Sequence, residues 1–162
     1  MEYRLDAQGE ARLAGYFDRI GEVLANKKRR EAFATYAMGL MGDGERKSAE
    51  PMAARSCPDP EKIGAAHNRM TYFTRNADWS DEKVRLVATQ YAIAAMTKKE
   101  PVSAWIIDDT GFLKQGTHSV GVQRQYTGSV GKVANCQVGV SLTVATANAH
   151  VPTDFRLYLP ES

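Results

Sequence analysis

Two adjacent aspartates, Asp108 and Asp109, stand at the end of a short apolar run in the stretch WIIDDTGFLKQG. Neighbouring carboxylates repel one another, and leaving water is costly for either unless a cation or a hydrogen-bond donor meets it. The run before them predicts a buried strand that ends at the acids. Because carboxylate oxygens are the ligands that Mg²⁺ prefers, and Mn²⁺ takes similar ligands, the pair is a candidate metal site.

An alternative interpretation is that the pair only ends a strand at a solvated loop. The residues that follow favour a bound partner, because Lys114, Arg124 and Lys132 lie close to the acids in sequence, with His118 and Tyr126 among them. Such a mixture is typical of a loop that contacts a phosphate backbone. A scatter of cations taken alone is more often a solvated surface, so the inference depends on the acids beside it.

Two further groups of basic residues occur earlier in the chain, NKKRR at residues 26–30 and ERKS at residues 45–48. Each is a candidate contact for a phosphate backbone, and each by itself is also typical of a solvated surface. The candidate DNA-binding residues in these groups are Lys27, Lys28, Arg29, Arg30, Arg46 and Lys47.

Other chemical motifs are not supported. GSVGK lacks the spacing of a phosphate-binding P-loop, and the three histidines are too dispersed to predict a metal site. Cys57 and Cys136 lie far apart without a C-x-x-C spacing, which predicts two free thiols.

The composition is that of a globular protein, with 43% hydrophobic and 25% charged residues among 162. A net charge of +2 permits a nucleic-acid partner without requiring one. No apolar run approaches the length of a membrane span, and the N-terminus has no signal-peptide pattern. We therefore expect a cytoplasmic protein that does not enter a membrane.

The first hundred residues have helical periodicity. A first helix with apolar residues between Leu13 and Leu24 is expected to run into the basic group at residues 26–30. Further helices are predicted around residues 33–40, where Gly42 and Gly44 can end the helix, and around residues 45–55. A fourth is predicted around residues 61–75, with Ile63, Met70 and Phe73 on one side. A fifth helix is expected to begin at Ser80 as N-cap and to bury Val84, Val87 and Tyr91. Residues 1–100 are thus predicted to form an all-helical module.

The character changes after residue 100. Residues 102–109, 133–146 and 150–159 predict three strands, the last two as an antiparallel pair joined by ANAH, with the glycine-rich TGSVG before the second strand. The predicted fold class is therefore α+β. Three strands leave apolar faces to be covered, so residues 101–162 have the pattern of the start of an α/β domain.

The run DDTGFLKQGTHSVGVQRQYTGSVGKVANCQ, continuing to Pro160, resembles the catalytic domain of bacterial DDE transposases of the insertion sequence 701 family. Upstream, YAMGLMGDGERKSAEPMA and ADWSDEKV resemble the helical region of the same family. The resemblance implies a DNA-binding helical module at 1–100 and the first three strands of a ribonuclease H-like catalytic domain at 101–162. It also implies Mg²⁺-dependent cleavage and transfer of DNA strands at transposon ends, with double-stranded DNA as partner.

The family's catalytic triad consists of two aspartates and one glutamate. Its first acid maps to Asp108, because Thr110 then completes a D-x-T pattern, or to the neighbouring Asp109. The other two acids are expected beyond Ser162, since Asp154 and Glu161 do not occupy matching places. The chain is accordingly expected to be a truncated segment that is catalytically incomplete by itself. It would reside in the bacterial cytoplasm, associated with the nucleoid.

The alternative function is a non-catalytic DNA-binding fragment that competes for transposon ends or occupies them. A homodimer is compatible with either interpretation, and the sequence leaves residual enzymatic activity of the chain open.

Overall fold

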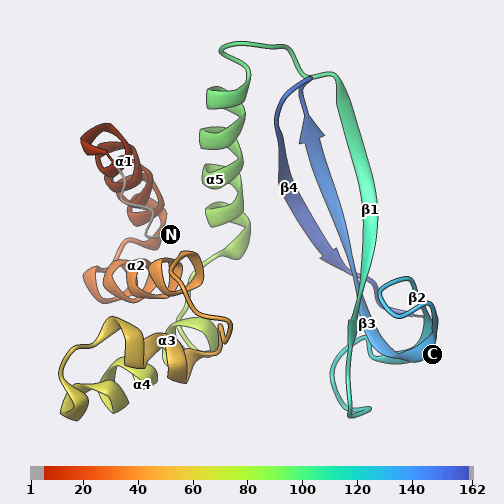
Figure 1. The fold of residues 1–162 in the computed structure, drawn as a ribbon, viewed down its shortest axis with the longest axis horizontal. Coiled ribbons are helices and arrows are strands. Elements are labelled where there is room, and N and C mark those ends of the chain that lie inside the picture. The colour runs from red at the N-terminus through yellow and green to blue at the C-terminus, as the bar shows by residue number, and fades with distance from the viewer. Residues whose placement is uncertain (1–5, 161–162) are drawn as a thin grey trace. The chain divides into compact units, whose positions relative to one another are not determined.

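The computed structural model describes residues 6–160, and the chain divides into two compact units, Met1–Val84 and Arg85–Ser162 (Figure 1). The division falls within a helix and follows the contacts of the backbone. The predicted change of role at residue 100, from DNA binding to catalysis, stays a prediction. No helix in the described part of the chain is both long enough and apolar enough to cross a membrane.

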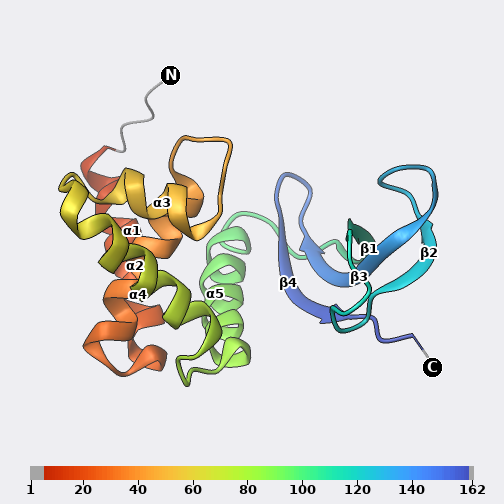
Figure 2. The same cartoon turned by 90° about the horizontal axis from the view of Figure 1, so that it is seen from below.

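The first unit is helical, as predicted (Figure 2). Its elements are α1 (Ala7–Leu24), α2 (Lys27–Met41), α3 (Ala49–Ser56), the 3₁₀ turn η1 (Pro60–Lys62), α4 (Ile63–Arg75) and the beginning of α5 (Asp81–Met96).

The basic group at residues 26–30 does not continue the first helix as expected, because α1 ends at Leu24. Ala25 has a positive φ of 59°, and Asn26 caps a new helix by accepting the backbone N–H groups of Lys28 (2.8 Å) and Arg29 (3.4 Å). The four cations therefore form the first turn of α2. Asparagine is a strong N-cap, which explains why the helix restarts here.

The third helix begins at Ala49 instead of Glu45. Gly44 has a φ of 119°, a conformation that favours glycine and interrupts a helix. Gly42 caps the end of α2, as predicted, and its N–H donates to the carbonyl oxygen of Met38 at 2.8 Å. The residues between these helices form an ordered loop.

The core of the helical unit lies between α2, α3 and α4. Met52 and Met70 are each 1% exposed, and Phe73 on α4 is 3% exposed. Phe73 stacks on Trp79 with ring centroids 5.0 Å apart, and the Trp79 indole N–H donates to the carbonyl oxygen of Phe73 at 2.9 Å. The predicted side of the fourth helix is thus confirmed, and Ile20 of α1 is also fully buried.

The predicted N-cap of the fifth helix is confirmed, because the Ser80 hydroxyl accepts the backbone N–H of Lys83 at 3.2 Å. The three residues that this helix was expected to bury are only half-buried. Within the second unit, α5 contacts a strand: the Thr89 hydroxyl donates to the carbonyl oxygen of Thr153 at 3.0 Å, and Arg85 Nε lies 3.2 Å from Asp154 Oδ1.

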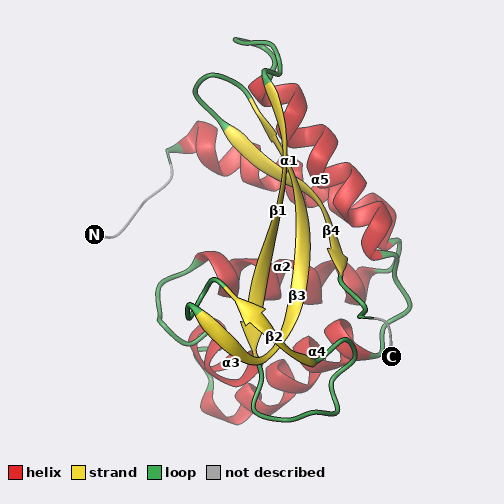
Figure 3. Cartoon of the chain, turned by 90° about the vertical axis from the view of Figure 1, so that its right-hand side faces the viewer, coloured by secondary structure: helices red, strands yellow, loops and turns green. Residues whose placement is uncertain are grey.

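The second unit contains an antiparallel sheet of four strands, so the α+β fold class is confirmed. Figure 3 shows β1, β3 and β4 as a long twisted ribbon, with β2 near the end where β3 begins. Strand β3 pairs with each of the others. The strands are β1 (Ala104–Leu113), β2 (Gln123–Thr127), β3 (Lys132–Ala145) and β4 (His150–Leu157).

The prediction of three strands was incomplete, because β2 is a fourth. Its residues QRQYT are mostly polar and carry no apolar alternation, so their pairing with β3 is visible only in the sheet. The TGSVG segment forms the turn between β2 and β3, and Gly131 in it has a φ of 65°. The predicted antiparallel pairing of the last two strands is confirmed as β3 with β4.

The predicted end of the first strand was wrong. Strand β1 continues past the acids to Leu113, because β3 offers a continuous partner from Ala145 to Cys136. The strand is also largely exposed: Ile106 is 45% exposed and Ile107 76%. An apolar run of this length predicts a strand but cannot show whether anything covers it.

Candidate functional site

The candidate acids lie in the middle of β1. Asp108 is opposite Ser141 of β3, and Asp109 is opposite Val140. Both carboxylates are exposed. Asp108 Oδ1 accepts the backbone N–H of Asp109 at 2.9 Å, and the Ser141 hydroxyl donates to the backbone carbonyl of Asp108 at 3.4 Å. The Ser141 contact links the backbone of the pair to β3, and both aspartates stay exposed.

The two carboxylates belong to opposite faces of the sheet, since successive strand residues alternate. Asp109 shares its face with Gly111 and with Val138 and Val140 of β3. Asp108 shares the other face with Phe112, which is 55% exposed. One ion therefore cannot be bound by both carboxylates from the same side of this strand.

Asp109 lines a hollow of about 370 Å³, together with Gly111, Tyr126, Thr127 and Ser129. The hollow lies where the β2–β3 hairpin meets β1. Thr127 is 3% exposed and packs directly on Gly111, where an added Cβ would lie 1.8 Å from the Thr127 hydroxyl oxygen. Glycine is required at this position because any side chain would displace the hairpin.

Two hydroxyl groups hold the hairpin turn against β1. The Ser129 hydroxyl donates to the carbonyl oxygen of Gly111 at 3.1 Å, and the hydroxyls of Ser129 and Thr127 lie 2.9 Å apart. The turn itself is closed by the N–H of Gly131, which donates to the carbonyl oxygen of Thr127 at 3.0 Å. The hydrogen bond from Ser129 to Gly111 therefore holds the hairpin turn as one wall of the hollow, and Gly111 lies two residues after Asp109.

The described residues do not make a complete site for a divalent metal. Among residues 6–160 no group of three or more histidine, cysteine, aspartate or glutamate side chains comes together. A divalent ion in a catalytic site takes several ligands, and two-metal sites need carboxylates from several strands. This chain can supply one or two carboxylates from β1, and further ligands would have to come from elsewhere.

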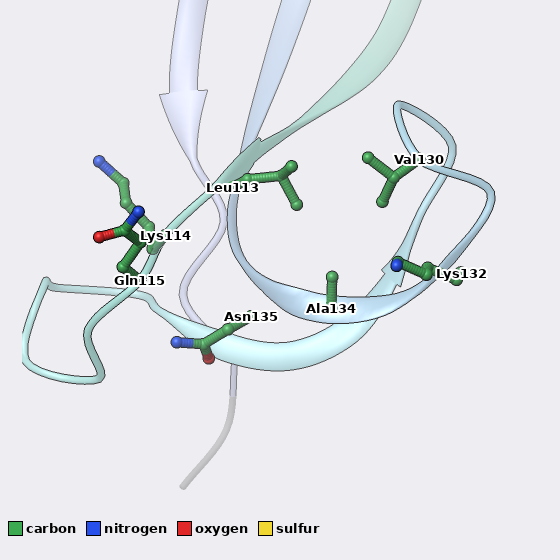
Figure 4. Close-up of a pocket in the computed structure, with 7 residues that line it drawn as sticks. All are labelled: Leu113, Lys114, Gln115, Val130, Lys132, Ala134 and Asn135. Atoms are coloured by element: carbon green, nitrogen blue, oxygen red, sulfur yellow. The ribbon is translucent and has the colours of Figure 1, made fainter.

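Lys114 and Lys132 both line a second hollow, of about 450 Å³, at the same end of the sheet. Figure 4 shows Leu113, Val130 and Ala134 around one space with the Lys132 ammonium at its rim. The side chain of Lys114 lies on the other side of the strand. The two lysines therefore lie at the same end of the sheet, but their ammonium groups do not point toward the same space.

Arg124 does not line either hollow. It lies on β2 opposite Asn135 of β3 and is exposed. The Asn135 amide donates to the carbonyl oxygen of Gly116 at 2.8 Å, which ties the loop after β1 to β3. Arg124 is therefore a surface cation near this end of the sheet.

The basic group at the start of α2 is brought together by the helix. Lys27 lies 3.8 Å from Glu31, an exposed pair one helical turn apart, and the Arg30 guanidinium donates to the carbonyl oxygen of Ala25 at 3.2 Å. The first turn of α2 contains no acidic residue, and Lys28 is exposed. Cations at the positive end of a helix dipole are unfavourable, so this arrangement suits an anionic partner.

Lys47 has a structural role that the sequence did not predict. Its ammonium group donates to the carbonyl oxygens of Gly42 and, at 3.5 Å, Gly39, and so occupies the end of α2. The Arg55 guanidinium donates to the carbonyl oxygen of Arg46 at 3.1 Å. Two DNA contacts were predicted in this loop, Arg46 and Lys47. The Lys47 side chain is bound to the end of α2, whereas Arg46 uses only its backbone carbonyl in these hydrogen bonds.

Sequence reasoning did not identify Gly111, Thr127 or Ser129. The glycine two residues after the acids was a usable signal, since a glycine within a strand often marks a close approach of another segment. The partner of that approach is sixteen or more residues away, and no local pattern connects the two.

Residues 19–162 match the family model described as "DDE superfamily endonuclease". The chain is also 30% identical, over 132 residues, to a protein of Microchaete diplosiphon described as "Probable transposase for insertion sequence element IS701". The match covers 80% of this chain and 32% of that relative, so the chain spans about a third of the relative's length. No solved structure is significantly similar to the chain.

Helices α2 to α5 and the strand that carries the acid pair all lie within the residues that the family model matches. The chain belongs to the DDE superfamily endonucleases, and the two matches together support a DDE transposase of the IS701 type.

Proposed function

We propose that this chain is the part of a DDE transposase that binds DNA through its helical unit and supplies the first catalytic acid from strand β1. The observation that carries the proposal is the family match over residues 19–162, which includes both the basic group of α2 and the acid pair. Its substrates would be double-stranded DNA at transposon ends and at the target.

DNA binding is supported by the charge of α2. The surface formed by Lys27, Lys28, Arg29 and Arg30 places four cations in a single helical turn whose dipole already favours an anion. The amide groups of this turn are partly satisfied by Asn26, so the contribution to DNA binding is that of the side chains. Arg46, Lys114, Arg124 and Lys132 are further proposed phosphate contacts, and Lys47 is the weakest because its ammonium is already bound.

The catalytic part of the proposal assigns Asp108 or Asp109 as the first ligand of Mg²⁺, with Mn²⁺ as substitute. When bound, the metal would polarise the phosphodiester that is cleaved. The D-x-T pattern favours Asp108, whereas the hollow lined by hydroxyl groups lies beside Asp109. Since the described residues do not complete a metal site, the chain by itself is proposed to be inactive.

A nicking assay tests the catalytic part. Supercoiled plasmid is incubated with the chain and Mg²⁺ or Mn²⁺, alongside the double variant Asp108→Asn, Asp109→Asn. We expect no nicking above that of the double variant. Metal-dependent nicking that the double variant abolishes would show that a working site assembles from this chain, for example across a homodimer, and sedimentation measurements would then identify the dimer.

The two acids can be separated by single substitutions. Mn²⁺ broadens the NMR signals of backbone amides near its binding site, so titration of the labelled chain would report on β1 without requiring cleavage. Broadening lost in Asp108→Asn and kept in Asp109→Asn would assign Asp108, and the reverse would assign Asp109. No broadening in the native chain would argue against either acid as a ligand in this chain.

The alternative, a non-catalytic DNA-binding fragment that occupies transposon ends, is favoured by the incomplete acid set in the described residues. Both functions predict DNA affinity that falls steeply with salt, with a log-log slope of about −0.9 for each phosphate neutralised. The fragment function also predicts that the chain inhibits an intact transposase by competition for its DNA ends. Affinity that is absent or insensitive to salt would contradict both.

A further inference from the structure

Helix α4 differs in charge from the other α-helices of the chain. Its sequence IGAAHNRMTYFTR contains Arg69 and Arg75 and no acidic residue, whereas each of the other α-helices contains at least one aspartate or glutamate. Exposed helices of soluble proteins usually mix charges of both signs. The exposed side of α4 is therefore a place where an anionic partner would meet no repulsion from the helix itself.

One side of α4 fixes the helix to the core. Ala66, Met70 and Phe73 are 4%, 1% and 3% exposed. Ala66 and Met70 pack with Met52 and Ala53 of α3, and the Phe73 ring lies 6.4 Å from the Phe33 ring of α2. Helix α3, the turn η1 and helix α4 follow one another in the chain, and α3 and α4 pack together (Figure 2). A helix held in this way presents its other side as a rigid surface.

The opposite side carries polar side chains that can read DNA. Asn68, Arg69, Tyr72 and Arg75 are exposed, Tyr72 by 63%, and their spacing of three and four residues places them along one side of the helix. None of these side chains has a hydrogen bond or an ion pair with another residue between 6 and 160. Arginine and asparagine are the side chains that form paired hydrogen bonds with guanine and adenine.

The dimensions of α4 suit the major groove. A helix of 13 residues is about 20 Å long, and the groove, about 12 Å wide, admits one α-helix. The first turn of the helix contains Gly64 and Ala65, both exposed and small, and a Cβ added at Gly64 would meet nothing within 4 Å. The helix can therefore approach the bases closely at this end.

The acidic residues near α4 do not oppose this approach strongly. Asp59, ahead of the helix, lies 2.8 Å from the ammonium group of Lys62. Glu61 is in the η1 turn, before the first residue of α4, and Asp78 follows the last. The negative charges thus lie at the two ends, and the middle of the exposed side is positive.

We propose that α4 is the recognition helix of this chain and reads base edges in the major groove of duplex DNA. Asn68 and Arg69, at the middle of the helix, contact bases, and Arg75, at its C-terminal end, contacts the phosphate backbone. This inference rests on the proposed DNA binding of the helical unit and specifies which of its surfaces determines sequence preference.

The test begins with selection from a pool of randomised duplexes by the native chain. Binding of the enriched duplex and of a scrambled duplex is then compared for the variants Asn68→Ala, Arg69→Ala and Arg69→Lys. Lys83→Ala, an exposed cation on α5, serves as the matched control. All three positions are exposed, so circular dichroism should show the native helical content in all four variants.

We expect Asn68→Ala and Arg69→Ala to weaken binding of the enriched duplex by roughly 5- to 100-fold and to change binding of the scrambled duplex far less. Arg69→Lys keeps the charge but loses the planar fork, so it should also lose preference for the enriched duplex. Lys83→Ala should bind like the native chain.

Three results would overturn the proposal. If the variants lost affinity for both duplexes equally, α4 would contact phosphates without reading bases. If they bound both duplexes like the native chain, α4 would not contact DNA, although the proposed function would stand. If the native chain retained no duplex from the pool at any salt concentration, the proposed function and this inference would fail together.

Discussion

The helical unit and the sheet unit bury their apolar residues to very different extents. In the helical unit Ile20, Leu24, Met52 and Met70 are at most 1% exposed. In the sheet unit β3 contains buried residues such as Val144, but β1 leaves Trp105, Ile106 and Ile107 between 45% and 76% exposed. The helical unit closes a core with its own residues, whereas the sheet unit leaves the strand of the candidate acids open.

The physical reason lies in the two kinds of element. A helix satisfies its own backbone and needs to bury one stripe, which four short helices can do for one another. A sheet has two faces and two edges to protect, and β1 pairs on one edge only within the described residues. The acids are accessible because the strand that carries them is the least covered part of the sheet.

The largest expected effect is on the free energy of unfolding, and it compares a buried side chain of the helical unit with an exposed one of the sheet unit. Met70→Ala should lower the free energy of unfolding of the helical unit by about 2–5 kcal/mol, because it leaves a cavity in a closed core. Ile107→Ala should change stability by less than about 0.5 kcal/mol, since that side chain is already in water. Each unit has its own tryptophan, Trp79 and Trp105, so denaturation followed by fluorescence in single-tryptophan variants reports on each unit. Equal effects of the two substitutions would break the comparison.

A second prediction concerns the one place where the sheet unit is tightly packed. Gly111→Ala should destabilise the sheet unit by about 1–3 kcal/mol, because the new methyl group collides with Thr127. Gly116→Ala is the matched control, since nothing lies within 4 Å of its added Cβ and its φ is not positive. If both variants unfolded at the same denaturant concentration, the close contact between β1 and the hairpin would be contradicted.

A smaller effect is expected at the start of α2. Asn26→Ala should cost about 1 kcal/mol of stability, because it removes the side chain that caps two backbone N–H groups. Ser48→Ala at the start of α3 should cost less, since Ser48 makes no side-chain cap hydrogen bond. Thermal unfolding monitored by circular dichroism would rank the two. The opposite ranking would mean that the caps do not determine where these helices begin.

The smallest effect on stability is expected for a substitution in the first turn of α2, which should also change the salt dependence of DNA binding. Lys28→Ala should stabilise α2 by about 0.3–1 kcal/mol, because one cation is removed from the positive end of the helix dipole. The same variant should reduce the magnitude of the salt slope of DNA binding by about 1. Lys83→Ala, which removes a cation from the first turn of α5, should raise stability by a similar amount and leave the slope unchanged. Weaker stability in Lys28→Ala, or an unchanged slope, would remove the argument that this surface serves an anionic partner.

Much of the helical unit could be predicted because its signals are local. Ser80 caps α5 and Gly42 ends α2 as the sequence indicates, and apolar spacing placed Met70 and Phe73 on the buried side of α4. The errors were at boundaries, at Asn26 and Gly44, where a cap or a backbone angle interrupts a helix that periodicity alone would continue.

The sheet unit was less predictable because strand pairing connects residues that are distant in sequence. The length of β1 depends on the partner that β3 offers, and β2 exists as a strand because it pairs with the start of β3. This pairing extends β1 past the acids, so that Asp108 and Asp109 alternate onto opposite faces of the sheet, whereas the sequence had placed both at the end of a strand.

The sequence by itself determined the order of the helices and of three of the four strands, the acid pair and the basic group of α2. These follow from residue types and short spacings, and the resemblance to DDE transposases follows from longer runs of sequence. Tertiary structure alone decided that the acids lie mid-strand, that Thr127 rests on Gly111, that Lys47 is bound to the end of α2, and that Asn68 and Arg69 share an open side of α4. Each of these depends on which distant segment packs against a residue, and that is a property of the folded chain as a whole.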